Sequence, residues 1–174
     1  YMRTSAAGVY AIGDCAGRQL LAHKAMHEGV ACVENIAGKA HRPVDYGNIP
    51  NVTYCHPEVA SVGLTEAQAR ERFGDGTSVC LWPMSAVDRA VTESDTSGFV
   101  KLVHRPNGTV LGATIVASRA GEMIHEWSLA IDHGLKVRHL AESMHVYPTY
   151  STAAIQITAK LRVDQVLAGS TGRL

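Results

Sequence analysis

Residues 98–117 read GFVKLVHRPNGTVLGATIVA, and no other stretch of the chain indicates a fold class as strongly. Two runs rich in β-branched and apolar residues, Gly98–His104 and Val110–Ala117, stand on either side of Arg105-Pro106-Asn107-Gly108. Asn-Gly tolerates positive φ at both positions, so two such runs around it are typical of a β-hairpin. We therefore expect these two runs to form an antiparallel pair of strands.

Shorter β-rich runs and several helical patterns surround this hairpin. The additional strands that we expect are Val52–Cys55, Ala60–Gly63 and Ser78–Met84. The spacing of apolar residues predicts helices over Thr65–Phe73, Ala120–His133, Lys136–Met144 and Thr149–Val166, the first opened by a capping box of Thr65 and Gln68. Strands come before helices along most of this region, which predicts an α+β domain with helices packed on one side of an antiparallel sheet.

The first 38 residues follow a different pattern. Gly8–Asp14 is a short apolar run that predicts a buried strand with a carboxylate at its C-terminal end. Leu20–Ala37 repeats apolar residues every three or four positions, which predicts a helix capped by Gly38. Residues 38–51 are rich in Gly, Pro and Asn and are interpreted as a linker, with a domain boundary near Pro50.

The charge balance argues against some classes of protein. Lys and Arg total 16 and Asp and Glu total 16, so the formal net charge is zero with neutral histidines. Proteins that bind nucleic-acid backbones normally carry a basic excess, and a membrane span needs roughly 20 apolar residues in succession. We expect neither a nucleic-acid partner nor a membrane.

The four cysteines, Cys15, Cys32, Cys55 and Cys80, are widely spaced and form no C-x-x-C pair. Structural zinc sites usually hold closely paired cysteines, so no such site is expected. Scattered single cysteines are typical of buried thiols in a reducing compartment. Because no apolar signal core follows Tyr1 either, the sequence predicts a cytoplasmic location.

Two groups of polar residues in the first part could carry chemistry. Asp14 leaves the predicted strand just before a helix, where a carboxylate can accept hydrogen bonds from sugar or ribitol hydroxyls; a turn or N-cap aspartate is the alternative. His23 and His27 lie four residues apart and could bind a metal together with Cys15. No carboxylate completes that set nearby, so we expect no metal site.

A second candidate region opens the last predicted helix. His145 and Tyr147 alternate in sequence, so in an extended turn they point to opposite sides. The Tyr147 phenol could donate a hydrogen bond or contact a soft metal ion, or it could simply pack with its hydroxyl satisfied. Glu122 and Glu126 are four apart on a predicted helix and form either a carboxylate pair or part of a solvated or interface surface.

Several segments occur in the order and spacing of one known family. They are TSAAGVYAIGD at 4–14, LAHKA at 21–25 followed by HEG at 27–29, and Ile49–Glu66, continued by 98–102, 111–113 and 121–124. The first three resemble the second flavin motif, the helix under the flavin and the entry to the C-terminal dimerisation domain of the FAD-dependent pyridine nucleotide–disulfide oxidoreductases. Dihydrolipoamide dehydrogenase, glutathione reductase and mercuric reductase belong to that family.

The resemblance implies that residues 1–47 are the last strand and helix of an FAD-binding domain and that residues 48–174 are the dimerisation domain. It implies FAD as the cofactor, with Asp14, beside Gly13, bonded to the ribitol–pyrophosphate part. Leu21, Ala22 and His23 would lie against the isoalloxazine ring, Ala22 and His23 chiefly by backbone.

The resemblance also implies a homodimer, formed through the C-terminal domain. The family's redox-active cysteine pair and its NAD(P)H-binding loops lie in upstream segments. A fragment without them supplies at most one wall of the site for hydride transfer, so we expect this chain alone to be catalytically inactive.

One departure from the family concerns the candidate catalytic residues. Dihydrolipoamide dehydrogenase and glutathione reductase have a His, paired with a Glu, where this chain has Tyr147 and Thr152. A phenol titrates near pH ~10 and is a poor general base, and His145 would be misdirected in an extended turn.

Mercuric reductase also has a Tyr at that place, but it ends in a vicinal cysteine pair, whereas residues 170–174 read STGRL. A mercuric-reductase-like metal-ion reductase and a self-association module without activity therefore remain as alternatives. The electron acceptor and the choice between NADH and NADPH stay open.

Overall fold

The computed structural model describes residues 1–38 and 43–170, which separate into two compact units, Tyr1–Gly47 and Asn48–Leu174. Residues 39–42, which belong to the predicted linker, and residues 171–174, most of the STGRL terminus, lie outside the described residues. Within the described ranges, no helix combines the length and apolar character needed to cross a membrane.

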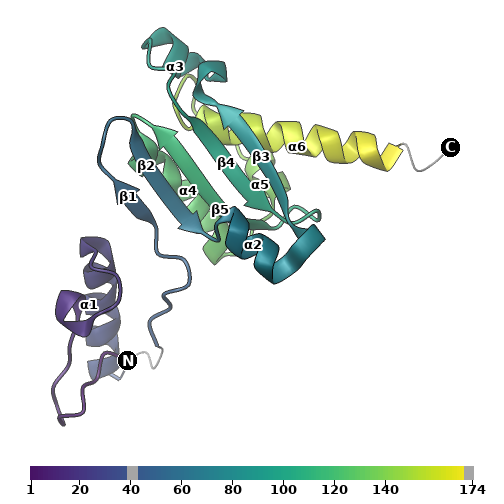
Figure 1. The fold of residues 1–174 in the computed structure, drawn as a ribbon. Helices are drawn as coiled ribbons and strands as arrows, with labels where there is room; N and C mark the ends of the chain where they lie inside the picture. Colours follow the sequence, from purple (N-terminus) through teal and green to yellow (C-terminus); the bar gives the residue numbers. More distant parts are fainter. Residues whose placement is uncertain (39–42, 171–174) are drawn as a thin grey trace. The chain divides into compact units, whose positions relative to one another are not determined.

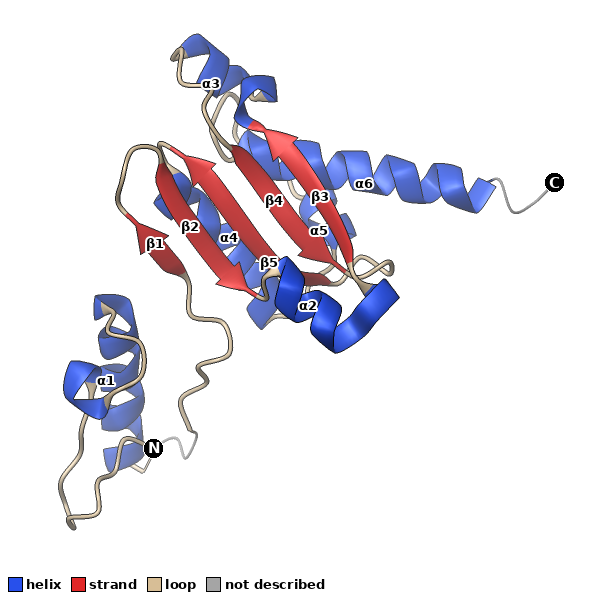
Figure 2. Ribbon diagram, in the orientation of Figure 1, coloured by secondary structure: helices blue, strands red, loops and turns tan. Residues whose placement is uncertain are grey.

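The larger unit is built on a five-stranded sheet in which every neighbouring pair is antiparallel (Figures 1 and 2). The strands lie in the order β1-β2-β5-β4-β3. Their bounds are Asn51–Thr53 for β1, Glu58–Gly63 for β2, Ser78–Pro83 for β3, Phe99–His104 for β4 and Val110–Ala117 for β5. The five predicted strands are confirmed, each end within two residues.

The hairpin of β4 and β5 lies in the middle of this sheet. The Gly108 N–H donates to the Arg105 carbonyl at 2.8 Å, and the Arg105 N–H donates to the Thr109 carbonyl at 2.9 Å. Gly108 has φ +85°, whereas Asn107 does not use positive φ. A bulge between Val103 and His104 shifts the register beside the turn. The hairpin prediction is confirmed, with only one residue of the Asn-Gly pair in the left-handed region.

Three helices cover one face of the sheet (Figure 1). They are α4 Ala120–Asp132, α5 Val137–Glu142 and α6 Thr152–Ser170. α4 packs on β2 and β5, and α6 packs on β3 and α5. The α+β architecture with an antiparallel sheet is therefore confirmed. α6 begins three residues later than predicted, because Thr149, Tyr150 and Ser151 form a turn that leads into it.

Two further helices lie outside this layer. α2 Glu66–Phe73 lies on the opposite face of the sheet, where Glu66 Oε2 is 2.6 Å from Lys101 Nζ of β4. Its capping box of Thr65 and Gln68 is confirmed. α3 Asp88–Thr92 follows β3 beyond the end of the sheet.

The core of the larger unit is apolar and follows the period of two along each strand. The inward side chains of the sheet are Ala60, Val62, Val100, Leu102, Ala113 and Ile115. Ile124 and Trp127 of α4 and Ile157 of α6 close over them, each at most 1% exposed. Burial of these side chains is the main stabilising contribution to this unit.

The smaller unit contains α1 Ala22–Ile36, and Gly38 follows it with φ +66°, as predicted. The predicted strand over Gly8–Asp14 is wrong. That segment makes one isolated bridge, Arg3 with Tyr10, and continues into a 3-10 turn at Gly13–Ala16. A strand needs neighbouring strands for its backbone N–H and C=O groups, and the described residues of this unit offer only that bridge.

The apolar residues that predicted α1 lie on its exposed side. Met26, Val30, Val33 and Ile36 are 57–74% exposed. The opposite side instead buries Lys24, Glu28, Ala31, Cys32 and Asn35. The periodicity correctly predicted a helix but not which side of it is covered in this structure.

The cysteine prediction is half wrong. Cys32 and Cys80 are buried, whereas Cys15 and Cys55 are exposed, and all four thiols are free. The two exposed residues lie in a 3-10 turn and in the loop after β1, where no neighbouring layer covers them.

Candidate functional site

The segment that the resemblance places at the active site is the loop between α5 and α6. Thr152, at the position of the family's Glu, is only 8% exposed. Its hydroxyl oxygen accepts from the Thr149 N–H at 3.2 Å, and the Thr149 hydroxyl donates to the Val146 carbonyl at 2.9 Å. Thr152 thus stabilises the turn that leads into α6 and carries no charge that could orient a catalytic group.

Tyr147 is 66% exposed, and its hydroxyl donates to Asp88 Oδ2 at 2.8 Å. The hydrogen bond to Asp88 and the negative charge of that carboxylate raise the pKa of Tyr147. The phenol is therefore neutral at physiological pH and takes no proton from a thiol. Sequence reasoning missed Asp88, because it belongs to α3 and lies 59 positions away.

His145 lies between two acceptors. Its Nε2 is 2.6 Å from Glu126 Oε1, and its Nδ1 is 2.9 Å from the Ser143 carbonyl oxygen. Burial lowers the pKa of His145, but these two acceptors outweigh it and the net effect raises the pKa. An imidazolium satisfies both contacts by donating twice, and neither nitrogen is then left to exchange a proton with a substrate.

Of the two interpretations of Glu122 and Glu126, the carboxylate pair is not formed, and the exposed Glu122 agrees with a solvated surface. Glu126 turns to His145, whereas Glu122 is exposed and lines a pocket. His145 and Tyr147 are thus attached to different helices, α4 and α3.

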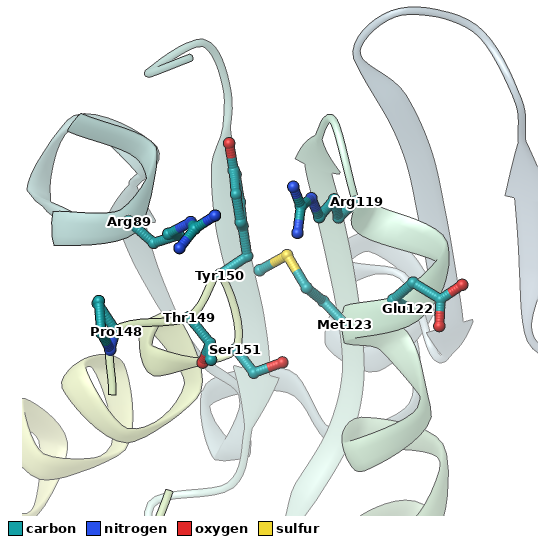
Figure 3. A pocket seen from close by; sticks show the side chains of 8 residues that line it. All are labelled: Arg89, Arg119, Glu122, Met123, Pro148, Thr149, Tyr150 and Ser151. Carbon is teal, nitrogen blue, oxygen red and sulfur yellow. The ribbon is translucent and has the colours of Figure 1, made fainter. Parts of the chain in front are cut away.

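A pocket of about 320 Å³ lies beside this loop (Figure 3). The loop lines it with Pro148, Thr149, Tyr150 and Ser151. Helix α3 contributes one further residue, α4 contributes two, and the N-cap residue of α4 contributes one. The remaining lining residues are Arg89, Arg119, Glu122 and Met123. Sequence reasoning did not find the two arginines, which approach from separate elements.

Glu93 joins the two arginines of this pocket. Its carboxylate accepts from Arg89 Nε at 2.6 Å and from Arg119 Nη2 at 3.2 Å. The Tyr150 hydroxyl donates to Glu93 at 3.0 Å and to Asp95 at 3.2 Å, and the Arg119 guanidinium lies 5.0 Å from the centre of its ring. This network fixes Tyr150 and compensates the charge of Glu93.

In the smaller unit, a buried ionic cluster holds the turn that contains the predicted flavin residues. Glu28, fully buried, accepts from the Gly13 N–H at 2.7 Å and from the Tyr46 hydroxyl at 2.7 Å. Lys24 Nζ is 3.3 Å from Glu28 and donates to the carbonyls of Gly13 at 3.0 Å and Gly17 at 2.8 Å. None of these three side chains was predicted to matter for the site.

The groups around Glu28 stabilise its negative charge, and this changes the pKa values of the cluster. Burial alone would raise the pKa of Glu28, but the Tyr46 hydroxyl, the Gly13 N–H and Lys24 lower it. Burial and the neighbouring Glu28 raise the pKa of Tyr46 to about 12. Glu28 is therefore an anion and Tyr46 a neutral donor.

The residues next to this turn leave room for a cofactor. Gly13 has φ +71°, and Asp14, Ala22 and His23 are exposed. Leu21, the N-cap of α1, makes no side-chain capping bond, and the first turn carries no acidic residue. The N–H groups at this helix end can thus face an electron-rich group, which fits a flavin ring.

The metal hypothesis for His23, His27 and Cys15 finds no support in the geometry. In residues 1–38 and 43–170, no group of three or more His, Cys, Asp or Glu side chains is arranged to hold a metal ion.

Comparison with known proteins agrees with the fold of the larger unit. The family model described as pyridine nucleotide-disulphide oxidoreductase, dimerisation domain, matches residues 49–156. Mitochondrial dihydrolipoyl dehydrogenase of Mus musculus is 43% identical over 152 residues, which cover 87% of this chain and 30% of that protein. The chain thus spans about a third or less of the length of such relatives.

The solved structures that resemble this chain include those of a flavoprotein disulfide reductase. LpdA from Mycobacterium tuberculosis is 28% identical with a TM-score of 0.84, covering 92% of this chain and 35% of that one. The Cu(II) complex of the HOCl-induced flavoprotein disulfide reductase RclA from Escherichia coli is 26% identical with a TM-score of 0.85, covering 91% and 36%. From its antiparallel sheet to the start of its last helix, this chain belongs to the dimerisation-domain family of the pyridine nucleotide-disulphide oxidoreductases.

Proposed function

We propose that this chain is the C-terminal, self-associating part of an FAD-dependent NAD(P)H oxidoreductase and that it has no catalytic activity by itself. The observation that carries the proposal is the family match over residues 49–156, which includes the whole sheet, α4, α5 and the first residues of α6. The similar proteins are named as dehydrogenases and disulfide reductases and are about three times as long as this chain.

Self-association would use the outer side of α6. Ala154 and Ile157 bury one side of this helix in the core, yet Val163 and Leu167, four residues apart, are 56% and 60% exposed. A helix with apolar residues on a second side normally has a second partner. A second copy of the chain would cover this side, and obligate dimer interfaces are large and apolar.

Sedimentation velocity of the chain at micromolar concentration tests this surface. We expect a dimer for the unmodified chain and a monomer for Val163→Asp/Leu167→Asp, because the variant would bury two carboxylates. Leu129→Asp, at a 57% exposed leucine of α4, serves as the control and should remain dimeric. A monomeric parent chain, or a dimer that persists in the double variant, would contradict the proposal.

FAD would be held in the parent protein by Gly13, Asp14, Leu21, Ala22 and His23. The flavin supplies two-electron transfer between NAD(P)H and the acceptor. The exposed Asp14 carboxylate would accept hydrogen bonds from ribitol hydroxyls, and the start of α1 would face the ring. The buried Lys24–Glu28 pair would keep this turn in place.

The inactivity of the fragment follows from what a thiol–disulfide reaction requires. It needs two thiols that can form a disulfide with each other, whereas Cys15, Cys32, Cys55 and Cys80 form no disulfide, and Cys32 and Cys80 are buried away from a substrate. We expect no NADH-dependent reduction of 5,5′-dithiobis(2-nitrobenzoate) by the chain mixed with FAD. Turnover above the protein-free background would contradict this expectation.

A metal-ion reductase is the second candidate. The exposed phenol of Tyr147 replaces the usual imidazole, and a similar disulfide reductase is known as a Cu(II) complex. In the complete flavoprotein, Tyr147→His combined with Thr152→Glu should raise disulfide reduction relative to Cu(II) reduction. No gain, with the fold intact, would mean that these two positions do not determine the acceptor.

A further inference from the structure

The phenol of Tyr147 has a carboxylate partner that comes from elsewhere in the fold. Its hydroxyl donates to Asp88 Oδ2 at 2.8 Å, and Asp88 is the first residue of α3. In the resembling enzymes the orienting carboxylate would stand at position 152, where this chain has a buried threonine. In this chain the carboxylate that contacts Tyr147 therefore comes from α3 and not from the start of α6.

Asp88 can accept the Tyr147 hydrogen bond because the two nearby arginines, Arg89 and Arg119, bind Glu93 instead. Arg89, the next residue, directs its guanidinium to Glu93 at 2.6 Å. Arg119 also binds Glu93, at 3.2 Å. In the described part of the chain, no salt bridge reaches Asp88, so its negative charge acts on the phenol without a compensating cation.

We propose that Asp88 is the positioning residue for Tyr147, replacing the charged partner that Thr152 does not provide. The inference rests on the proposed function, in which Tyr147 stands in the site of a flavin-dependent reductase. The raised pKa of Tyr147, caused first by its hydrogen bond to Asp88 and then by the charge, agrees with a phenol kept protonated.

The arrangement determines what the phenol offers to a ligand. Its hydrogen is directed to Asp88, so the lone pairs of its oxygen face outward from a side chain that is 66% exposed. The Asp88 carboxylate lies on the other side of the phenol oxygen from solvent. Such a group favours ligands that donate a hydrogen bond or carry positive charge, and it disfavours anions.

Fluorine NMR of the chain labelled with fluorotyrosine tests the contact directly. Fluorination brings phenol titration to lower pH, and Tyr147→Phe assigns the Tyr147 signal among the six tyrosines. Asp88→Asn should move the titration midpoint of Tyr147 down towards that of an unperturbed tyrosine and change its chemical shift at neutral pH. Asp88→Glu should retain part of the effect.

Tyr150 provides a matched control, because its hydroxyl also donates to a carboxylate, Asp95, at 3.2 Å. Asp95→Asn should alter the Tyr150 signal and leave the Tyr147 signal unchanged. If Asp88→Asn leaves both the midpoint and the neutral shift of Tyr147 unchanged in a folded chain, the inference is wrong.

The functional consequence is tested in the complete flavoprotein with NADH and an uncharged disulfide, oxidised dithiothreitol, because the carboxylate beside the phenol disfavours anions. Tyr147→Phe removes the phenol oxygen as a hydrogen-bond acceptor and should lower kcat/KM by about tenfold, the effect of one lost hydrogen bond. Asp88→Asn should lower kcat/KM less and move the alkaline limb of the pH–rate profile to lower pH. If Tyr147→Phe has no effect, the proposed function of Tyr147 fails. If Tyr147→Phe is slow and Asp88→Asn behaves as the parent in rate and profile, the inference about Asp88 fails alone.

Discussion

The described residues of each unit include a lysine–carboxylate pair with i, i+4 spacing on a helix. Lys24 and Glu28 of α1 are 3.3 Å apart with side chains 2% and 0% exposed. Lys160 and Asp164 of α6 are 2.7 Å apart with side chains 51% and 53% exposed. The Lys160–Asp164 pair contributes less to stability although its distance is shorter, because water already stabilises both of its charges. Lys24 and Glu28 are shielded from water, so each charge needs the other for its stabilisation.

The comparison extends to the two units as a whole. The smaller unit buries a cation and an anion, with a partly buried phenol beside them, and leaves Met26 and Val33 exposed. The larger unit encloses Leu102 and Ile115 and leaves both side chains of the Lys160–Asp164 pair about half exposed. Electrostatic contacts should therefore dominate the stability of the smaller unit and apolar packing that of the larger one.

Glu28→Ala should have the largest effect and should act on the smaller unit alone. The change leaves Lys24 buried without a counter-charge, and breaking a buried pair in this way costs about 3–5 kcal/mol of unfolding free energy. A unit of 47 residues has a small free energy of unfolding, so such a loss should unfold it. Amide hydrogen exchange followed by mass spectrometry should show protection lost over α1 and unchanged over β4 and β5.

A double replacement sharpens this prediction. Lys24→Met/Glu28→Leu removes both charges, so it should recover part of the lost protection. Recovery stays incomplete because the Gly13 N–H and the Tyr46 hydroxyl lose their acceptor. If Glu28→Ala leaves the exchange of α1 unchanged, the ionic cluster does not hold this unit.

Leu102→Ala should be nearly as costly, but in the larger unit. Leu102 is fully buried in β4, and truncation of such a leucine costs about 2–5 kcal/mol. Trp82 and Trp127 both lie in this unit, so urea unfolding followed by tryptophan fluorescence reports on it alone. Leu81→Ala, at a 55% exposed leucine of the neighbouring strand, is the control and should change little.

The sequence predicted the larger unit well because its signals are local. The hairpin turn at Asn107-Gly108, the capping box at Thr65 and the period of two along β5 need no information from distant residues. The strand at Gly8–Asp14 failed for the opposite reason. A strand exists only with its neighbours, and the described residues give this one a single bridge to Arg3.

The candidate site was predicted only in part. Tyr147 and His145 could be singled out from their own positions, but their partners Asp88 and Glu126 lie 59 and 19 residues away. For Glu28, the sequence predicted only that a charged residue lies on a helix. Whether such a charge faces water or a turn depends on tertiary packing, which spacing alone does not reveal.

Glu28 and His145, one in each unit, should also contribute to stability with opposite dependence on pH. The pKa of Glu28 is lowered in the folded state, so its contribution is present above the unfolded value and is lost as pH falls. The pKa of His145 is raised, so its contribution is complete below the unfolded value of about 6.5 and is lost as pH rises through the folded value.

The difference in unfolding free energy between the parent chain and His145→Gln measures the second effect. It should reach about 0.5–1 kcal/mol near pH ~5.5, after allowance for solvent screening, and shrink at alkaline pH. His125→Gln, at an exposed histidine of the same helix as Glu126, should give no such trend. A difference that grows with pH would mean that His145 is neutral in the folded chain.

Asp164→Asn should have the smallest effect, and that makes it the matched test of the comparison with Glu28. It removes the anion from a pair of the same spacing and a shorter distance, but Lys160 keeps its water and its charge. We expect no change in the urea midpoint of the larger unit beyond the scatter of repeated measurements. A loss comparable with that of Glu28→Ala would mean that distance, rather than burial, governs these pairs, and the ionic interior of the smaller unit would need another explanation.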